Sequence, residues 1–139
     1  PDQGAVEKVR DFGTVFYGRP DFSEAVIEKR RDQTIPHKAE PIDLYGNVKD
    51  KVAVIVDDMV VSGSTLLPAV ELCLKKGARE VYATAVHHDF TSGASQKIQS
   101  SQLKRFFTTD TIALSKDEQC DKLVEISVAS LIVHELKHL

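Results

Sequence analysis

The sequence contains no long hydrophobic run, no low-complexity tract and only two cysteines among its 139 residues. A transmembrane helix would need a stretch of about 18 apolar residues, and no basic segment followed by an apolar one opens the chain as in a secretory leader. Cys73 and Cys120 lie far apart in the sequence and form no metal-like pair. These features predict reduced thiols and a cytoplasmic location.

The sequence also lacks a strong excess of charge. A net charge of −3 gives no general reason to expect binding to nucleic acid or to a membrane. The fractions of hydrophobic residues (42%) and charged residues (28%) are those of a globular chain, which is long enough for one domain with a core. We find no internal repeat and expect residues 1–139 to form a single domain. Because the chain begins with Pro1 rather than Met, we expect it to be part of a longer protein.

Strand and helix patterns alternate along most of the chain. Residues 51–58, KVAVIVDD, are nearly continuous β-branched apolar sequence, typical of a central parallel strand that is covered on both faces. Residues 65–78 have a helical pattern that ends at Gly77. The remaining pattern predicts helices at 4–12, 92–101 and 130–139, strands at 24–31, 80–88, 103–111 and 122–129, and a polar loop at 32–49 that contributes little to the core. This alternation predicts an α/β fold with a parallel sheet.

Two carboxylates and three hydroxyl residues follow the apolar run, in the stretch VDDMVVSGST at residues 56–65. Asp57 and Asp58 are good acceptors for sugar hydroxyls and could hold Mg²⁺ through water. The hydroxyls and the loop amides, at the start of a helix, can donate to phosphate oxygens. The three hydroxyl residues are Ser62, Ser64 and Thr65. The pattern indicates a ligand with a diol at one end and a phosphate at the other, although the two acids could instead merely cap the following turn.

The stretch VDDMVVSGSTL resembles the ribose-phosphate binding loop of phosphoribosyltransferase-fold proteins. Its nearest likeness is the ribose-phosphate pyrophosphokinase (phosphoribosyl-pyrophosphate synthetase) family. Further segments resemble that family in the same order along the chain: PDQGAVEKVRDF, AVIEKRR, GAREVYATAVHHDFTSGA, FFTTDTIAL and CDKLVEISVASL. Together they are far more specific than one loop. The resemblance implies a type I phosphoribosyltransferase-like (Rossmann-like) domain, the C-terminal half of a longer synthetase-like chain.

The resemblance also implies an activity, the transfer of diphosphate from Mg-ATP to the 1-hydroxyl of ribose 5-phosphate, in nucleotide biosynthesis. Such a transfer depends on positioning and positive charge more than on covalent catalysis. Lys29 would match the catalytic lysine that stabilises the transferred group, Arg31 an arginine beside the reacting phosphates and the ribose phosphate, and Asp2 an aspartate that helps to hold Mg²⁺. Asp57 and Asp58 would face the ribose hydroxyls. The residues that would cradle the 5-phosphate are Val61, Ser62, Gly63, Ser64 and Thr65.

The sequence departs from the resembled family in three ways. Val61 stands where an aspartate is expected, and the loss of one charged acceptor would weaken binding by roughly 1.5–3 kcal/mol. In the same loop, Ser64 replaces a glycine close to the phosphate. Second, His88 replaces a glycine and is expected to restrict the backbone there. The family binds ATP partly through an N-terminal half that this chain lacks. We therefore expect the fragment alone to be inactive. The resemblance also implies that the protein self-associates into oligomers.

Three functions remain open from the sequence. The first is the ribose-5-phosphate-binding domain of the diphosphokinase. The second, which Val61 would permit, is a non-catalytic synthetase-like regulatory subunit. The third is a nucleobase phosphoribosyltransferase, which is less favoured because no segment resembles a hood for a base and the chain carries the synthetase-like KRR.

Other signals have ordinary alternatives. The segment EKRR could be a solvated charge run, and His87 and His88, at a strand end, could be either ligand-facing or structural. HELKH, from His134 to His138, matches the H-E-x-x-H zinc pattern. Only Leu139 follows it in the sequence, so we expect no downstream third ligand, and the preceding SLIV predicts an ordinary terminal helix packed against the sheet.

Overall fold

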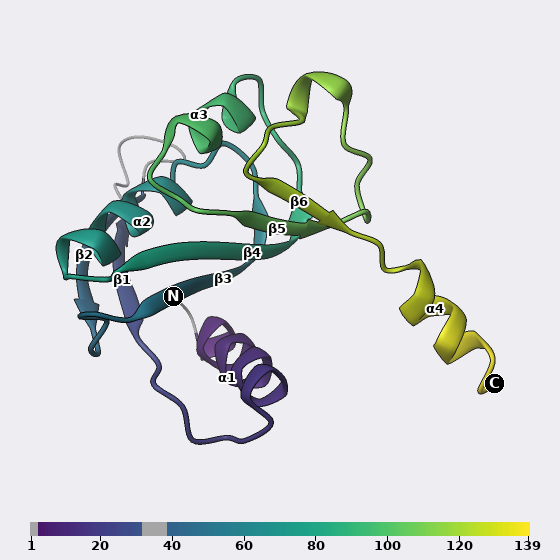
Figure 1. Cartoon of the computed structure of the whole chain (residues 1–139), viewed down its shortest axis with the longest axis horizontal. Coiled ribbons are helices and arrows are strands. Elements are labelled where there is room, and N and C mark those ends of the chain that lie inside the picture. Colours follow the sequence, from purple (N-terminus) through teal and green to yellow (C-terminus); the bar gives the residue numbers. More distant parts are fainter. Residues whose placement is uncertain (1–2, 32–38) are drawn as a thin grey trace.

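The computed structural model describes residues 3–31 and 39–139 and shows a parallel sheet with helices against it (Figure 1). In chain order the elements are α1 (Gln3–Tyr17), β1 (Val26–Arg31), β2 (Ala39–Tyr45), β3 (Val52–Val60), α2 (Leu66–Lys75), β4 (Glu80–His88), α3 (Ala94–Ser100), β5 (Phe106–Thr109), a short 3₁₀ turn (Lys116–Glu118), β6 (Leu123–Ile126) and α4 (Ala129–Leu136). From β3 to β5 the strands and helices alternate as the sequence predicts, whereas β1, β2 and β3 follow one another without a helix between them. None of the described helices has both the length and the apolar character needed to cross a bilayer.

The main sheet has the order β3-β4-β5-β6, and all of its neighbouring strands are parallel. Ala83 pairs with Phe106, which pairs with Leu123, so side chains in these positions share one face of the sheet. That face packs against α2 and α3, and Val81 and Phe106 on it are fully buried. The core of the molecule therefore lies between the sheet and these two helices.

Local sequence determines where α2 ends. Gly77 has a φ of +92°, and its amide donates to the carbonyl of Leu74 at 2.9 Å. The amide of Ala78 donates to the carbonyl of Cys73 at 3.0 Å. This is the pair of hydrogen bonds that closes a helix at a left-handed glycine, and the end predicted at Gly77 is confirmed. Cys73 is buried in the core as an unpaired thiol, and burial raises its pKa.

The predicted loop at residues 32–49 is wrong in its second half. Residues 39–45 form β2, which pairs antiparallel with β1 in a separate two-stranded sheet. Leu44 and Val48 are buried despite the polar sequence around them. Pro41 lies opposite Lys29, beside the register shift between Glu28 and Lys29, where a residue without an amide hydrogen is tolerated. The part of the predicted loop at 32–38 lies outside the described residues.

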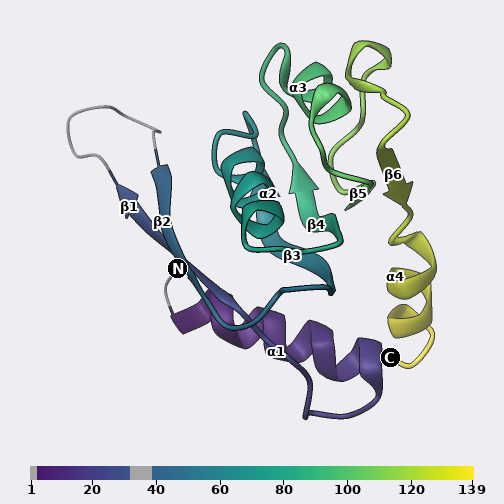
Figure 2. The same ribbon diagram turned by 60° about the vertical axis from the view of Figure 1, so that its left-hand side comes forward.

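The second face of the sheet is only partly covered. The only described helix lying across it is α1, which passes beneath β3, whereas α2 and α3 lie on the opposite side (Figure 2). The prediction that β3 is a central strand covered on both faces is wrong, because β3 is an edge strand and Val52 and Val54 are exposed. Val86 on β4 and Ile126 on β6 are exposed on the same face.

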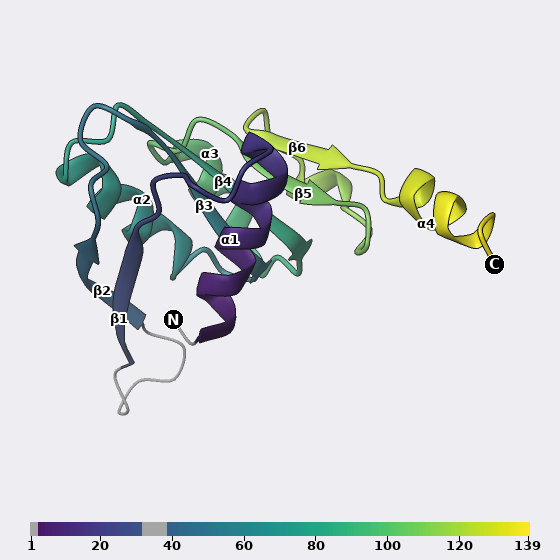
Figure 3. The same ribbon diagram turned by 90° about the horizontal axis from the view of Figure 1, so that it is seen from below.

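The terminal helix α4 also differs from the expectation. It was predicted to pack against the sheet through SLIV, but it extends away beyond β6 (Figures 1 and 3), and none of its residues is buried. Leu131, at the start of the helix, is 62% exposed. The apolar stripe that predicts packing is present, but the described part of the chain places no surface against it.

Candidate functional site

The candidate site begins at the carboxyl end of β3. This strand continues through Asp57 and Asp58 and ends at the buried Val60. Asp57 is half-buried and Asp58 is exposed, so the two neighbouring carboxylates have different environments. Gly63 has a φ of +74°, a backbone conformation that favours glycine, and its carbonyl accepts a hydrogen bond from the amide of Leu67 at 2.9 Å. The loop therefore connects the end of β3, which carries the two acids, to α2.

The hydroxyls of the loop lie close together above the first turn of α2. Ser62 Oγ donates to Ser64 Oγ at 2.8 Å, and the amide of Ser64 donates to Ser62 Oγ at 3.3 Å. Thr65 is the N-cap residue, but its side chain makes no capping hydrogen bond. The positive end of the helix dipole and the amide donors of the first turn favour an anion at this point. The predicted phosphate loop thus has donors that a phosphate could accept from.

A lysine of α1 lies beside the two acids. Lys8 Nζ lies 3.0 Å from Asp58 Oδ2 in an ion pair, with both side chains more than half exposed. The hydrogen bond from Lys8 lowers the pKa of Asp58, and a hydrogen bond with Asp57 lowers it further. Exposed pairs of this kind contribute little to stability, so a ligand can replace the lysine at small cost. Sequence reasoning missed Lys8, because only the fold brings α1 beside the end of β3.

The ends of β3 and β4 are held side by side. The amide of Asp89 donates to the carbonyl of Val60 at 3.0 Å, and the amide of Thr91 donates to the carbonyl of Val61 at 3.0 Å. Met59 pairs with His87 in the parallel ladder. His87 therefore lies at the same edge of the sheet as the two acids, as parallel strands require.

A second group of hydroxyls surrounds His87. Its Nδ1 lies 2.8 Å from Thr111 Oγ1, which lies 2.9 Å from Thr109 Oγ1. Thr109 also donates to the carbonyl of Val86 at 2.7 Å. Sequence reasoning missed the two threonines, although the hydroxyl-rich TTDT directly after a strand pattern was a signal for them. Nearby, the hydrogen bond from Ser127 lowers the pKa of Asp110.

His88 faces the opposite side of the sheet and is almost completely buried. Its Nδ1 lies 3.1 Å from Thr108 Oγ1, and its ring packs against Phe90. Its Nε2 has no hydrogen-bond partner in the described part of the chain. The expected backbone restriction does not cause strain, because His88 lies in β4 with no positive φ. Of the two predicted histidines, His87 is at the candidate site and His88 is a core residue.

The predicted catalytic residues cannot all be compared with this geometry. Lys29 and Arg31 lie in β1, where their backbones pair with Pro41 and Ala39 of β2. Asp2 lies outside the described residues. The roles assigned to Lys29, Arg31 and Asp2 therefore stay predictions.

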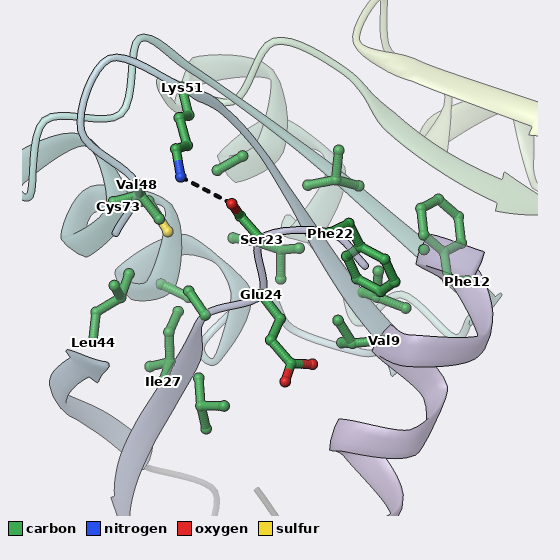
Figure 4. Close-up of a pocket in the computed structure, with 18 of the residues that line it drawn as sticks. Val9, Phe12, Phe22, Ser23, Glu24, Ile27, Leu44, Val48, Lys51 and Cys73 are labelled. Carbon is green, nitrogen blue, oxygen red and sulfur yellow. Dashed lines mark hydrogen bonds between the residues drawn. The ribbon is translucent and has the colours of Figure 1, made fainter. Parts of the chain in front are cut away.

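An apolar cavity of about 220 Å³ opens beside β3, between α1, α2 and the segment leading to β1 (Figure 4). Val9, Phe12 and Phe22 line it, and Lys51 Nζ donates to Ser23 Oγ at 3.1 Å at its edge. A phosphate requires several hydrogen-bond donors, and this largely apolar wall has few polar side chains, among them Ser23 and Lys51. Among the residues whose side chains the structure describes, Asp57 and Thr65 are the members of the predicted site that also line this cavity. The cavity adjoins the candidate site but is unsuited to a sugar phosphate.

Fold and site together define an α/β protein whose candidate ligand site lies at the carboxyl ends of parallel strands, beside a hydroxyl-rich loop at a helix N-terminus. Comparison with known proteins identifies the family. Residues 14–139 match the family described as phosphoribosyl synthetase-associated domain. The chain therefore belongs to this family, and the resemblance seen in the sequence is confirmed.

Similar proteins extend well beyond the length of this chain. The ribose-phosphate pyrophosphokinase of Bacillus caldolyticus is 34% identical over 136 residues, covering 98% of this chain and 41% of that protein. The protein of the same name from Nostoc sp. is 36% identical over 132 residues, covering 95% of this chain and 38% of that protein. The crystal structure of phosphoribosylpyrophosphate synthetase from Mycobacterium smegmatis matches with a TM-score of 0.80 at 25% identity, covering 97% of this chain and 41% of that one. The predicted α/β class is confirmed, and the chain spans about two-fifths of the length of these relatives.

Proposed function

We propose that this chain is the ribose-5-phosphate-binding domain of a ribose-phosphate diphosphokinase, forming the C-terminal part of a longer protein. The reaction would transfer diphosphate from Mg-ATP to ribose 5-phosphate and give phosphoribosyl pyrophosphate. Membership in the family supports the assignment. The observation that carries it is the placement of Asp57 and Asp58 at the end of β3, directly before the hydroxyl-rich turn into α2.

The two ends of the site suit the two ends of the sugar phosphate. Asp57 and Asp58 offer acceptors for the ribose hydroxyls, and Lys8 is bonded to Asp58 only through an exposed ion pair. The hydroxyls of Ser62 and Ser64, with the first amides of α2, donate to the 5-phosphate. These interactions would hold the sugar in one orientation, so that its 1-hydroxyl faces the bound nucleotide.

The carboxylate oxygens of Asp57 and Asp58 also suit Mg²⁺, which prefers oxygen ligands and keeps several of its waters. Asp57 and Asp58 would hold it through water molecules, since the described residues contain no group of three side chains that could ligate a metal directly. Asp2 is the proposed direct ligand, carried over from the resemblance. When bound, Mg²⁺ neutralises phosphate charge. The chain's own contribution is to fix the two carboxylates at the strand end.

Other segments would supply the positive charge and the ATP contacts that the reaction also needs. Lys29 and Arg31, on β1, would supply positive charge to the transferred group. The rest of the longer protein would supply further contacts to ATP, so this fragment alone would not run the reaction. We also propose that the protein self-associates. Light scattering that finds only monomers of the 139-residue chain at high concentration would count against self-association through this domain.

The test is calorimetric titration of the 139-residue chain with ribose 5-phosphate, with and without Mg²⁺. The wild type should bind saturably, and the double variant Asp57→Asn/Asp58→Asn should lose binding, because amides accept sugar hydroxyls far less well than carboxylates. Asp11→Asn, a change at an exposed position of α1, is the matched control and should bind as the wild type does. Equal binding by the double variant would exclude the two acids as the sugar site.

One observation favours a second candidate, a non-catalytic synthetase-like subunit. Val61 stands where an aspartate is expected, and its side chain is 39% exposed at the candidate site, where it cannot accept a hydrogen bond. The same titration separates the two functions. A folded wild type that does not bind ribose 5-phosphate at millimolar concentration would favour the non-catalytic subunit.

A further inference from the structure

Two histidines lie four residues apart at the end of the chain, His134 in the last turn of α4 and His138 in the turn that follows the helix. The ring centroids of His134 and His138 are 4.4 Å apart, and the ring planes are tilted by 46°. Both side chains are exposed, and α4 stands away from the sheet (Figures 1 and 3). The spacing is that of residues i and i+4, whose side chains lie above one another on a helix. Two imidazoles thus meet where solvent has free access to both.

The second ring is oriented by the backbone. His138 Nδ1 lies 2.7 Å from the carbonyl oxygen of His134. A carbonyl only accepts hydrogen bonds, so Nδ1 must carry the proton and donate. In the neutral ring the lone pair is then on Nε2, which is the form that binds metals. Metal-ligating histidines typically have their other ring nitrogen held in this way by a carbonyl or carboxylate. The hydrogen bond prepares His138 as a ligand in the absence of a cation.

We propose that His134 and His138 chelate one divalent transition-metal cation, of the kind that prefers imidazole, such as Zn²⁺ or Ni²⁺. Zn²⁺ in proteins binds histidine nitrogens at about 2.0–2.1 Å and is usually four-coordinate. The described residues contain no group of three potential ligands, so solvent completes the coordination of the pair. The site is therefore a two-histidine clamp. It is not a protease centre, although HELKH has the zinc-protease spacing.

The clamp would affect α4 itself. None of the residues of α4 is buried, so the helix lacks the tertiary packing that supplies most helical stability in proteins. A cation bridging two successive turns holds the backbone between them in helical form. Binding should therefore increase the helicity of the end of the chain. The site is separate from the acids of β3 and does not depend on ribose 5-phosphate.

The test is titration of the full 139-residue chain with ZnCl₂ and, separately, NiCl₂, by calorimetry and by circular dichroism. The wild type should bind one cation per chain and gain helical signal. His134→Ala and His138→Ala should each weaken binding at least tenfold, since one imidazole cannot chelate, and should lose the gain in helicity. Lys137→Ala, a change between the two histidines, is the matched control and should retain both effects. Sizing alongside the titration gives the number of chains per cation.

The outcomes are distinct. One cation per two chains, lost in either histidine variant, would support the clamp with a second copy's pair completing the coordination. Equal affinity in the wild type and in either histidine variant would overturn the proposal, since the cation would then bind elsewhere. Absence of metal binding by the folded wild type throughout the titration would overturn it as well. Both histidines are exposed, so the variants should fold.

Discussion

Val61 is the residue of the candidate loop at which the chain departs from the aspartate that the family resemblance leads us to expect. The amide of Thr91 donates to its carbonyl, which holds the backbone in place, while the side chain is partly exposed. A carboxylate at this position could therefore reach solvent or ligand without being buried. The apolar side chain removes one acceptor but leaves the loop geometry intact.

We predict that Val61→Asp tightens the binding of ribose 5-phosphate. A hydrogen bond to a charged group contributes roughly 1.5–3 kcal/mol, which corresponds to a tenfold or greater change in the dissociation constant. Val61→Leu, which stays apolar, should leave affinity near that of the wild type. Calorimetry of the three chains side by side would measure the change. An aspartate variant that binds no better than the leucine variant would show that residue 61 does not face the sugar.

Single residues of the site differ in how far the sequence could predict them. Asp57 and Asp58 directly follow an apolar run, and that local order is enough to place them at a strand end. Lys8 is far from them in the chain, so no local pattern connects it to Asp58. Two adjacent histidines on a strand must face opposite sides of the sheet, but only the folded contacts with Phe90 and Thr108 show that His88 is the buried one.

Helix α1 is held on the segment before β1 by a close contact at Gly13. A Cβ built at this position would lie 2.1 to 2.6 Å from ring atoms of Phe22. The ring of Phe22 therefore packs on the bare backbone of the helix. Arg10 and Glu24 form an ion pair at 2.9 Å that joins the same two segments.

We predict that Gly13→Ala destabilises the chain, although the same change in an open helix would stabilise it by about 1 kcal/mol. The added methyl forces the Phe22 ring or the helix to move, and such overpacking costs about 1–3 kcal/mol. Urea unfolding would measure the loss. In a Phe22→Ala background the clash is absent, so Gly13→Ala should there be neutral or stabilising. A destabilisation of equal size in both backgrounds would contradict the contact.

The elements predicted best are those whose signals are local. Gly77 marks the end of α2 because the left-handed turn needs no partner from elsewhere in the chain. β2 was missed because its stability comes from pairing with β1 and from burial of Leu44, neither of which shows as a pattern in its own polar residues. The apolar stripe of α4 was correctly seen as helical. Its packing was not predictable, because amphipathicity indicates that a helix can be buried and does not identify the surface that buries it.

At the scale of the whole molecule, the sheet has two unequal faces. Val81, Ala83 and Ala85 of β4 face α2 and α3. The residues between them face the other side of the sheet, where α1 lies beneath β3 (Figure 2). Val86 is 49% exposed and Ile126 is 52% exposed on this open face. Parallel sheets are usually covered on both faces, which is why the apolar run of β3 led to the wrong expectation of a central strand. A continuous apolar run indicates that a strand can be covered on both faces. It does not indicate whether the strand is central or at the edge, because the strand order depends on contacts that one sequence does not show.

The open face gives the last prediction. Apolar surface of this kind binds the dye ANS, so the folded chain should enhance ANS fluorescence. Val86→Lys/Ile126→Lys should reduce that fluorescence, and it should change stability far less than a lysine placed in a covered sheet, because half of each side chain already meets solvent. Val15→Lys, the same kind of change at an 85% exposed position on α1, should leave dye binding largely unchanged. If the double variant lost its circular dichroism signal, the face would have to be covered in solution. Unchanged dye binding by a folded double variant would place the apolar surface elsewhere, with α4 as the next surface to test.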